Sequence, residues 1–400
     1  MSDGPPLFER VEETDLSRDR NPRRLLRRHW PAAVLAVGVL LAGIGFSVEH
    51  LRGDALPVVG DLEPMDWVLA VSLFAIATAV AATVRTLSAA RRYLRALRRH
   101  PSALAAVVVT TAFLVVGLVA PLFASEPTGI RFTRGYQPPV WMSVSTEVTL
   151  AGCVGALADG HCHGTWQYPL GTTRAGRDVL AYVLLGTRTA VEVAVVSAVL
   201  LVGIGVSLGL VSASVGGRVD AALMRFAEIL GTVPAVIVYM LFWNWNAEYR
   251  LLMLVAVFGV VNWGGIARTV RNEALALRDR PFVKAARASG ASRWHVVRHH
   301  LLPNVARPIV ATLAVQVPAI VLTEAALSFV VVSVETGEVT LGDATVVSWG
   351  QTIHLGANVE GLFPYWWITT APLVALVAFA VSIAVFGRAL NDVLDPEPGR

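Results

Sequence analysis

The chain has 400 residues, of which 55% are hydrophobic and 16% are charged, and its formal net charge is +4. Two or three soluble domains of this total length would need a far more charged surface, so the composition excludes a soluble multidomain protein. The apolar residues gather in runs of about 18 or more, each long enough to cross roughly 30 Å of hydrocarbon as a helix. The sequence therefore predicts a polytopic membrane protein.

Eight such runs follow one another along the chain. They are 31–49, 66–84, 103–124, 187–213, 228–246, 250–267, 308–332 and 365–387. Backbone polar groups in lipid have no water to bond, and the runs lack the alternation of barrel strands, so all eight are predicted to be helices. Residues 1–30 are predicted to be a cytoplasmic arm that begins as a disordered tail. No small-residue cleavage site closes the first run, which favours a retained helix over a signal peptide.

Arginine is concentrated in alternate connections between these runs. The connection 85–100 holds six arginines and no acidic residue, and the connection 268–304 is also strongly basic. Because short cytoplasmic connections are enriched in arginine and lysine, both are predicted to lie inside the cell. Eight crossings then place both chain termini in the cytoplasm, and they place the segments 125–186 and 333–364 outside.

The polar connection 270–304 is punctuated as two short helices. Asp279 is placed to cap a first turn that contains Pro281, and Gly290 is placed to end that helix in the left-handed conformation. Ser292 offers a cap for a second helix, which Pro303 stops.

The first of these short helices has two faces. Phe282, Ala285, Ala286 and Ser289 share one face, whereas the cationic residues lie on another. A small face flanked by cations suits a groove on a soluble partner, but arginines can equally hold an amphipathic helix on anionic lipid. Spacing alone leaves both alternatives open.

The same segment resembles the EAA loop of permease subunits of binding-protein-dependent ABC importers. Lys284-Ala285-Ala286, Gly290 and Leu302-Pro303 match its spacing, with Lys284 in place of the usual glutamate and His300 in place of the usual isoleucine. The fuller run 282–292 looks like the version in the dipeptide/oligopeptide/nickel branch. The resemblance implies that an ATPase docks on Phe282, Lys284, Ala285, Ala286, Arg287, Gly290, Leu302 and Pro303.

Further segments resemble the same branch, in the same order along the chain. They are 169–180, 324–329 with 348–350, and 390–396. The resemblance implies an all-α membrane protein with a six-helix permease core in residues 101–400, including the outer segment 125–186 and the coupling loop 270–304. Residues 31–100 are then two additional transmembrane helices with a basic cytoplasmic loop. Candidates for translocation or for core structure are Gly176, Arg177, Asp178, Pro318, Glu324 and Ser328.

Several residues inside the apolar runs predict local features of helix packing, helix shape and hydrogen bonding. Gly205 and Gly209 allow another backbone to approach closely, and Pro318 is predicted to kink its helix. Carboxylates inside a membrane need partners or water. Glu324 is predicted to face the transport pathway or to bond a neighbouring helix, and Glu192 is predicted to be hydrated near the outer interface.

Both cysteines of the chain, Cys153 and Cys162, lie in the outer segment beside His161 and His163. Three alternatives remain open: a disulfide, free thiols, or a metal site that includes the histidines. The oxidising exterior favours the disulfide, and no bound metal is expected.

The chain lacks the glycine-rich P-loop that cradles nucleotide phosphates, and Lys284 is its single lysine. We therefore expect no enzymatic activity and no cofactor in this chain, with ATP and Mg²⁺ used by separate subunits. The resemblance implies four kinds of partner: a second homologous permease, two ATP-binding cassette ATPases, an extracytoplasmic substrate-binding protein and membrane lipid. No nucleic-acid partner is expected, and the location is the plasma membrane of a prokaryote.

The resemblance implies an importer permease for di- or oligopeptides, nickel or related small solutes. A secondary transporter is one alternative, and it would show repeated halves and paired intramembrane charges. A membrane-embedded enzyme is another, and it would need clustered His, Asp or Glu near one membrane face.

Overall fold

A computed structural model describes residues 36, 38–40, 42–43, 45–47, 63–83, 101–124, 131–149, 152–242, 249–302, 304–335, 347–359 and 363–393. The chain divides into two compact units, Met1–Leu62 with Ala70–Ala90 and Glu63–Leu69 with Arg91–Arg400. Most of the first predicted run, 31–49, lies outside the described residues. Helix α3, Pro64–Thr83, corresponds to the second run and passes from the second unit into the first.

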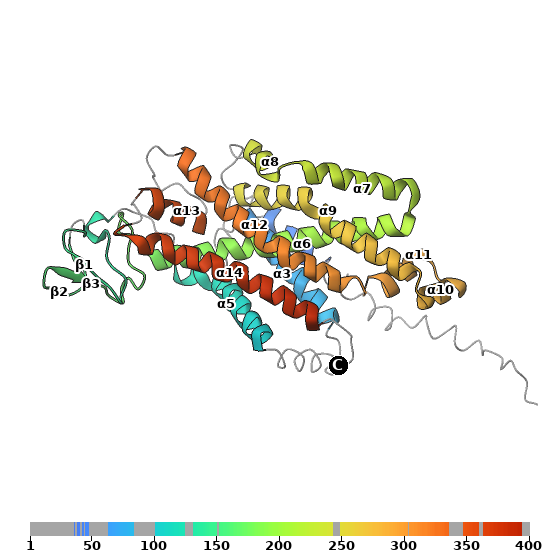
Figure 1. The fold of residues 1–400 in the computed structure, drawn as a ribbon, viewed down its shortest axis with the longest axis horizontal. Helices are drawn as coiled ribbons and strands as arrows, with labels where there is room; N and C mark the ends of the chain where they lie inside the picture. The colour runs from blue at the N-terminus through green and yellow to red at the C-terminus, as the bar shows by residue number, and fades with distance from the viewer. Residues whose placement is uncertain are drawn as a thin grey trace, which may run out of the picture. The chain divides into compact units, whose positions relative to one another are not determined.

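The second unit is built mainly from long helices. These are α5 (Pro101–Phe123), α6 (Val179–Val215), α9 (Arg250–Arg278), α12 (Ala306–Glu335) and α14 (Trp366–Val393), and their contacts form the bundle seen in Figure 1. Within the described residues, these five and α3 are the helices long and apolar enough to cross a membrane as single spans. Six of the eight predicted runs therefore correspond to apolar helices of sufficient length.

Close packing of α6 on α9 depends on two glycines, as expected. A Cβ on Gly205 would lie 2.8 Å from Ile266, and one on Gly209 would lie 2.6 Å from the carbonyl oxygen of Ala267. Only hydrogen fits in these positions, so the two backbones approach more closely than larger residues would allow.

The fifth predicted run, 228–246, is not a continuous helix. Helix α7 extends over Gly217–Thr232, α8 extends over Ala235–Phe242, and the two are bent by 72°. The break falls at Val233, whose ψ of 123° is extended because the ring of Pro234 disfavours a helical residue before it. Taken together the bent pair could form a seventh span; residues 243–246 lie outside the described chain.

One end of the second unit carries a small sheet, so the fold is mostly helical and not strictly all-α. Strands β1 (Ser143–Ser145), β2 (Leu157–Ala158) and β3 (His161–His163) form an antiparallel sheet in the order β1-β3-β2, preceded by a short 3-10 turn, η2 (Phe132–Arg134). A disulfide joins Cys153 to Cys162, whose side chain is fully buried. Since both sulfurs are used by the disulfide, neither is available as a thiolate for a metal site.

The disulfide is expected to stabilise this segment locally. Closing a loop with a sequence separation of 9 contributes about 2 to 3 kcal/mol on the chain-entropy account. We expect Cys153→Ser to speed hydrogen exchange of the β3 amides, including His163 N, which donates to Ala156 O. Exchange in α9 should not change, and equal acceleration in both places would contradict a local role.

The shorter helices lie at the ends of the bundle. Helix α13 (Trp349–His354) continues into a π-helical turn, η5 (Leu355–Val359). Helix α10 (Pro281–Ala288), α11 (Arg293–Val296) and the π-helical turn η4 (Val297–Leu301) connect α9 to α12. Figure 1 shows this connection at the opposite end of the second unit from the sheet.

Candidate functional site

The segment 279–302, here called the docking hairpin, begins differently from the prediction. Asp279 does not cap α10; it ends α9, with φ −90° and ψ −5°, and its N–H donates to Leu277 O. Arg280 is the N-cap residue, with an extended ψ of 144° and no side-chain cap. The cause is Pro281, whose ring excludes the helical conformation from the residue before it.

The end of α10 follows the prediction. Gly290 has φ +81°, the left-handed conformation. The Gly290 N–H donates to Arg287 O and the Ala291 N–H donates to Ala286 O, both at 3.0 Å. This pair of bonds is a Schellman motif, which satisfies the last carbonyl groups of the helix.

The second part of the hairpin starts at its predicted cap. The Ser292 hydroxyl accepts a hydrogen bond from His295 N at 3.2 Å. The rings of Phe282 and His300 lie 5.9 Å apart, so the histidine that departs from the family pattern packs back against α10. Pro303 lies outside the described residues.

One side chain that the sequence analysis did not single out anchors α10. Val283 is fully buried, whereas Lys284, Ala285, Arg287 and Ala288 are exposed and Ala286 is half-buried. With Val283 turned into the protein, the other positions of this short helix are left accessible. Val283 could have been recognised as the single branched aliphatic residue of α10.

The docking hairpin also exposes large apolar side chains. Phe282 is 44% exposed, Trp294 is 70% exposed and Leu302 is 43% exposed. Trp294 was not among the predicted docking residues, although a tryptophan in a polar connection is a visible signal. Exposed large apolar groups in so basic a segment are typical of a contact with another protein.

At the sheet end, the predicted candidates Gly176, Arg177 and Asp178 hold the start of α6. Gly176 has φ +72° and lies directly against the carbonyl group of Arg131, which leaves no room for a Cβ. The Asp178 carboxylate caps α6 by accepting from Leu180 N at 2.9 Å. Burial raises the pKa of Asp178, and the backbone hydrogen bond opposes that shift. Arg177 is buried and donates to the Tyr182 hydroxyl at 3.1 Å.

Two segments that resemble family landmarks meet in space. The Ser328 hydroxyl donates to Glu324 at 2.7 Å, and the side chain of Ser348, the N-cap of α13, is a second partner of this carboxylate. Gly350 lies against the backbone of Ala325. Glu324 is buried, and its partners lie on α12 and at the start of α13. Pro318 is buried inside α12.

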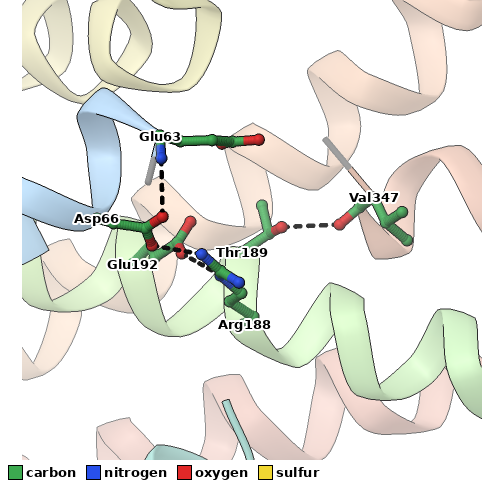
Figure 2. Close-up of polar contacts among 6 residues, drawn as sticks. All are labelled: Glu63, Asp66, Arg188, Thr189, Glu192 and Val347. Atoms are coloured by element: carbon green, nitrogen blue, oxygen red, sulfur yellow. Dashed lines mark hydrogen bonds and ion pairs between the residues drawn. The ribbon is translucent and has the colours of Figure 1, made fainter. Parts of the chain in front are cut away.

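The expectation for Glu192 was wrong. Its side chain is 5% exposed and pairs with Arg188 Nε at 2.8 Å, one turn earlier on α6. Arg188 also pairs with Asp66 near the start of α3, and Asp66 Oδ2 accepts from Glu63 N at 3.1 Å. Figure 2 shows this group, with the adjacent Thr189 hydroxyl donating to Val347 O at 2.7 Å. Arg188, Glu192, Asp66, Thr189 and Val347 are called the Arg188 group. Their contacts hold the start of α3 and the segment just before α13 against α6.

Residues 205–399 match the family described as binding-protein-dependent transport system inner membrane component. The oligopeptide transport system permease protein OppC of Haemophilus influenzae is 28% identical over 296 residues, covering 74% of this chain and 85% of that protein.

Two further relatives agree with this match. OppC of Escherichia coli K12 is 33% identical over 227 residues, covering 57% of this chain and 72% of that protein. The dipeptide transport system permease protein DppC of Lactococcus lactis is 30% identical over 230 residues, covering 58% of this chain and 64% of that protein. With these relatives and its apolar helices, the chain belongs to the binding-protein-dependent transport family, as an ABC importer permease of the dipeptide/oligopeptide branch.

Proposed function

We propose that this permease receives force from a separate ATPase through the docking hairpin. The observation that carries this proposal is the exposure of Phe282, Trp294 and Leu302 on a hairpin whose first helix is anchored by Val283. A short helix with one buried anchor and an accessible outer surface fits a groove on a soluble protein. ATP and Mg²⁺ are used by the ATPase subunits. Their closure pushes the docking hairpin and switches the transport pathway between its inward-facing and outward-facing conformations.

The assembly proposed for this chain has a fixed orientation. The docking hairpin and both termini face the cytoplasm, on the side where arginine is concentrated. The sheet segment faces outward, where an extracytoplasmic binding protein delivers the solute. A second homologous permease and two ATPases complete the transporter in the plasma membrane of a prokaryote.

The solute proposed for this permease is a di- or oligopeptide, because relatives are named as oligopeptide and dipeptide permeases. Nickel or a related small solute is the wider range that the branch allows. Uptake of labelled peptides by cells with and without the chain would decide between them.

The domain boundaries proposed here keep the arm 1–30, two additional transmembrane helices in 31–100 and the permease core in 101–400. One contact gives the additional part a role. Asp66, at the start of α3, pairs with Arg188 of α6, so α3 has a charged attachment to the core and is not merely tethered by the chain.

The docking proposal is tested by placing a negative charge on each of two faces of α10. Ala285 and Ala288 are both exposed, but Ala285 shares its face with Phe282 and Ala288 does not. We expect Ala285→Asp to reduce co-purification of the ATPase and solute uptake at least about 10-fold, because a desolvated charge at an interface costs at least 1.4 kcal/mol.

The matched control is Ala288→Asp, which adds the same charge to the same helix. Its co-purification and uptake should stay within about 2-fold of the unmodified protein, a difference of less than 0.5 kcal/mol. Equal retention of the ATPase by both variants, with normal membrane insertion, would overturn the docking proposal.

A further inference from the structure

A stripe of polar and small residues runs along each of two neighbouring transmembrane helices. On α9 it comprises Asn262, Gly265 and Thr269, and on α12 it comprises Thr312, Gln316 and Thr323. The spacings of three, four and seven residues place each set on one helix face. All six residues are half-buried, and together they are called the polar seam below.

The two stripes face one another. Gln316 lies opposite Gly265, because a Cβ on Gly265 would be 2.7 Å from Gln316 Nε2. Helices α9 and α12 are joined through α10 and α11 at one end of the bundle (Figure 1), so they run in opposite directions. Helix geometry then places Thr269, four residues after Gly265, near the level of Thr312, four residues before Gln316. Gln316 is ten residues after the start of α12, roughly 15 Å along the helix and thus near the middle of a hydrocarbon layer about 30 Å thick.

Polar residues at such a seam usually hold two membrane helices together by hydrogen bonds between them. In this chain four of the seam side chains donate hydrogen bonds within their own helix. Asn262 Nδ2 donates to Phe258 O, and the Thr269 hydroxyl donates to Gly265 O, both within α9. The hydroxyls of Thr312 and Thr323 likewise donate to carbonyl groups of α12, those of Pro308 and Ala319. No bond between these six side chains crosses the seam within the described residues.

One strong acceptor in the seam is left without a partner. The amide oxygen Oε1 of Gln316 is buried and has no hydrogen-bond partner among the described residues. An unpaired amide oxygen in the middle of a membrane is strongly unfavourable, because no water is there to replace its missing hydrogen bond. Such a group persists where water or a solute reaches it, and polar groups at this depth mark transport pathways.

We propose that the polar seam lines the transport pathway and that Gln316 Oε1 accepts a hydrogen bond from an N–H group of the passing solute. The hydrogen bonds that Asn262, Thr269, Thr312 and Thr323 donate are made within their own helices, so Gln316 Oε1 is an acceptor without a formal charge that they do not satisfy. Such an acceptor suits ammonium and amide N–H groups. It rests on the proposed peptide import, since a peptide carries both kinds of donor.

Water access to the seam can be measured directly. Both cysteines of the chain are joined in the disulfide, so one introduced cysteine is the single free thiol. We expect Gln316→Cys and Thr269→Cys to react with a charged, water-soluble methanethiosulfonate at least about 10-fold faster than Val315→Cys. Val315, next in sequence, is 71% exposed but outside the seam, and we expect it to face lipid. Equal or faster labelling of Val315→Cys would overturn the seam as a pathway.

The role of the amide oxygen is tested with Gln316→Leu, which keeps a side chain of similar size and removes the acceptor. We expect a rise of at least about 5-fold in the KM for uptake of a labelled tripeptide, with unchanged co-purification of the ATPase. An unchanged KM would overturn the role of Gln316. If no peptide is taken up even by the unmodified permease, the peptide proposal fails, whereas the labelling pattern still reports on the seam.

Discussion

Replacing Arg188 with leucine should lower the free energy of unfolding by about 3 kcal/mol, because removal of the arginine leaves the buried charge of Glu192 uncompensated. In this chain two carboxylates lose their partner at once, those of Asp66 and Glu192. The measurement is the shift in the denaturation midpoint of the purified permease in detergent.

The matched control is an arginine paired on the surface. Arg225 lies 3.9 Å from Glu228 three residues later, and both side chains are well exposed. Arg225→Leu should change stability by less than about 1 kcal/mol, since surface pairs of this kind contribute little. A second change, Glu192→Gln, should restore part of the loss in Arg188→Leu by removing the buried charge. Equal losses for the two arginine variants would contradict a structural role for the Arg188 group.

The sequence contains a local indication of the Arg188–Glu192 pair, but the hydropathy pattern obscured how deeply the pair is buried. Arg188 and Glu192 are four residues apart, the spacing at which helical side chains pair. The apolar window began at 187, although α6 begins at Val179, so Glu192 was predicted to lie close to an interface. The third partner, Asp66, is more than a hundred residues away, and no local pattern could have placed it.

Two further errors share a local cause that the sequence did contain. Val233 and Arg280 each precede a proline, and both are extended. The extended Val233 breaks the helix predicted over 228–246. The extended Arg280 takes the place of Asp279 as the N-cap residue of α10. Hydropathy also missed the first half of α7, because that stretch carries charged residues such as Asp220, which pairs with Arg271 of α9.

Features governed by a single residue's conformation or size were predictable. Gly290 ends α10 in the left-handed region and Ser292 caps α11, since both effects depend on a few adjacent atoms. Gly205 and Gly209 admit α9 because they lack a side chain. The polar seam was not predictable, because it requires the register between α9 and α12, which tertiary packing sets.

Replacing Trp349 with alanine should have the largest effect of a single core substitution, a loss of about 3 to 5 kcal/mol. The indole is buried and lies between Phe113 of α5 and Phe379 of α14, with ring centroids 6.4 and 5.8 Å away. Its Nε1 donates to Val183 O of α6 at 3.0 Å. One side chain of α13 thus joins three long helices, and the alanine variant leaves a cavity among them.

Two other variants separate packing from the loss of any tryptophan. Trp166 is 81% exposed in the sheet segment, so Trp166→Ala should stay within about 0.5 kcal/mol of the unmodified protein. Trp349→Phe keeps a ring but leaves Val183 O without its donor, and should fall between the two. The midpoints of thermal unfolding in detergent order the three variants. If Trp349→Ala matched Trp166→Ala, α13 would not hold the helices together, and the contact between Ser348 and Glu324 would have to fix that end of the bundle alone.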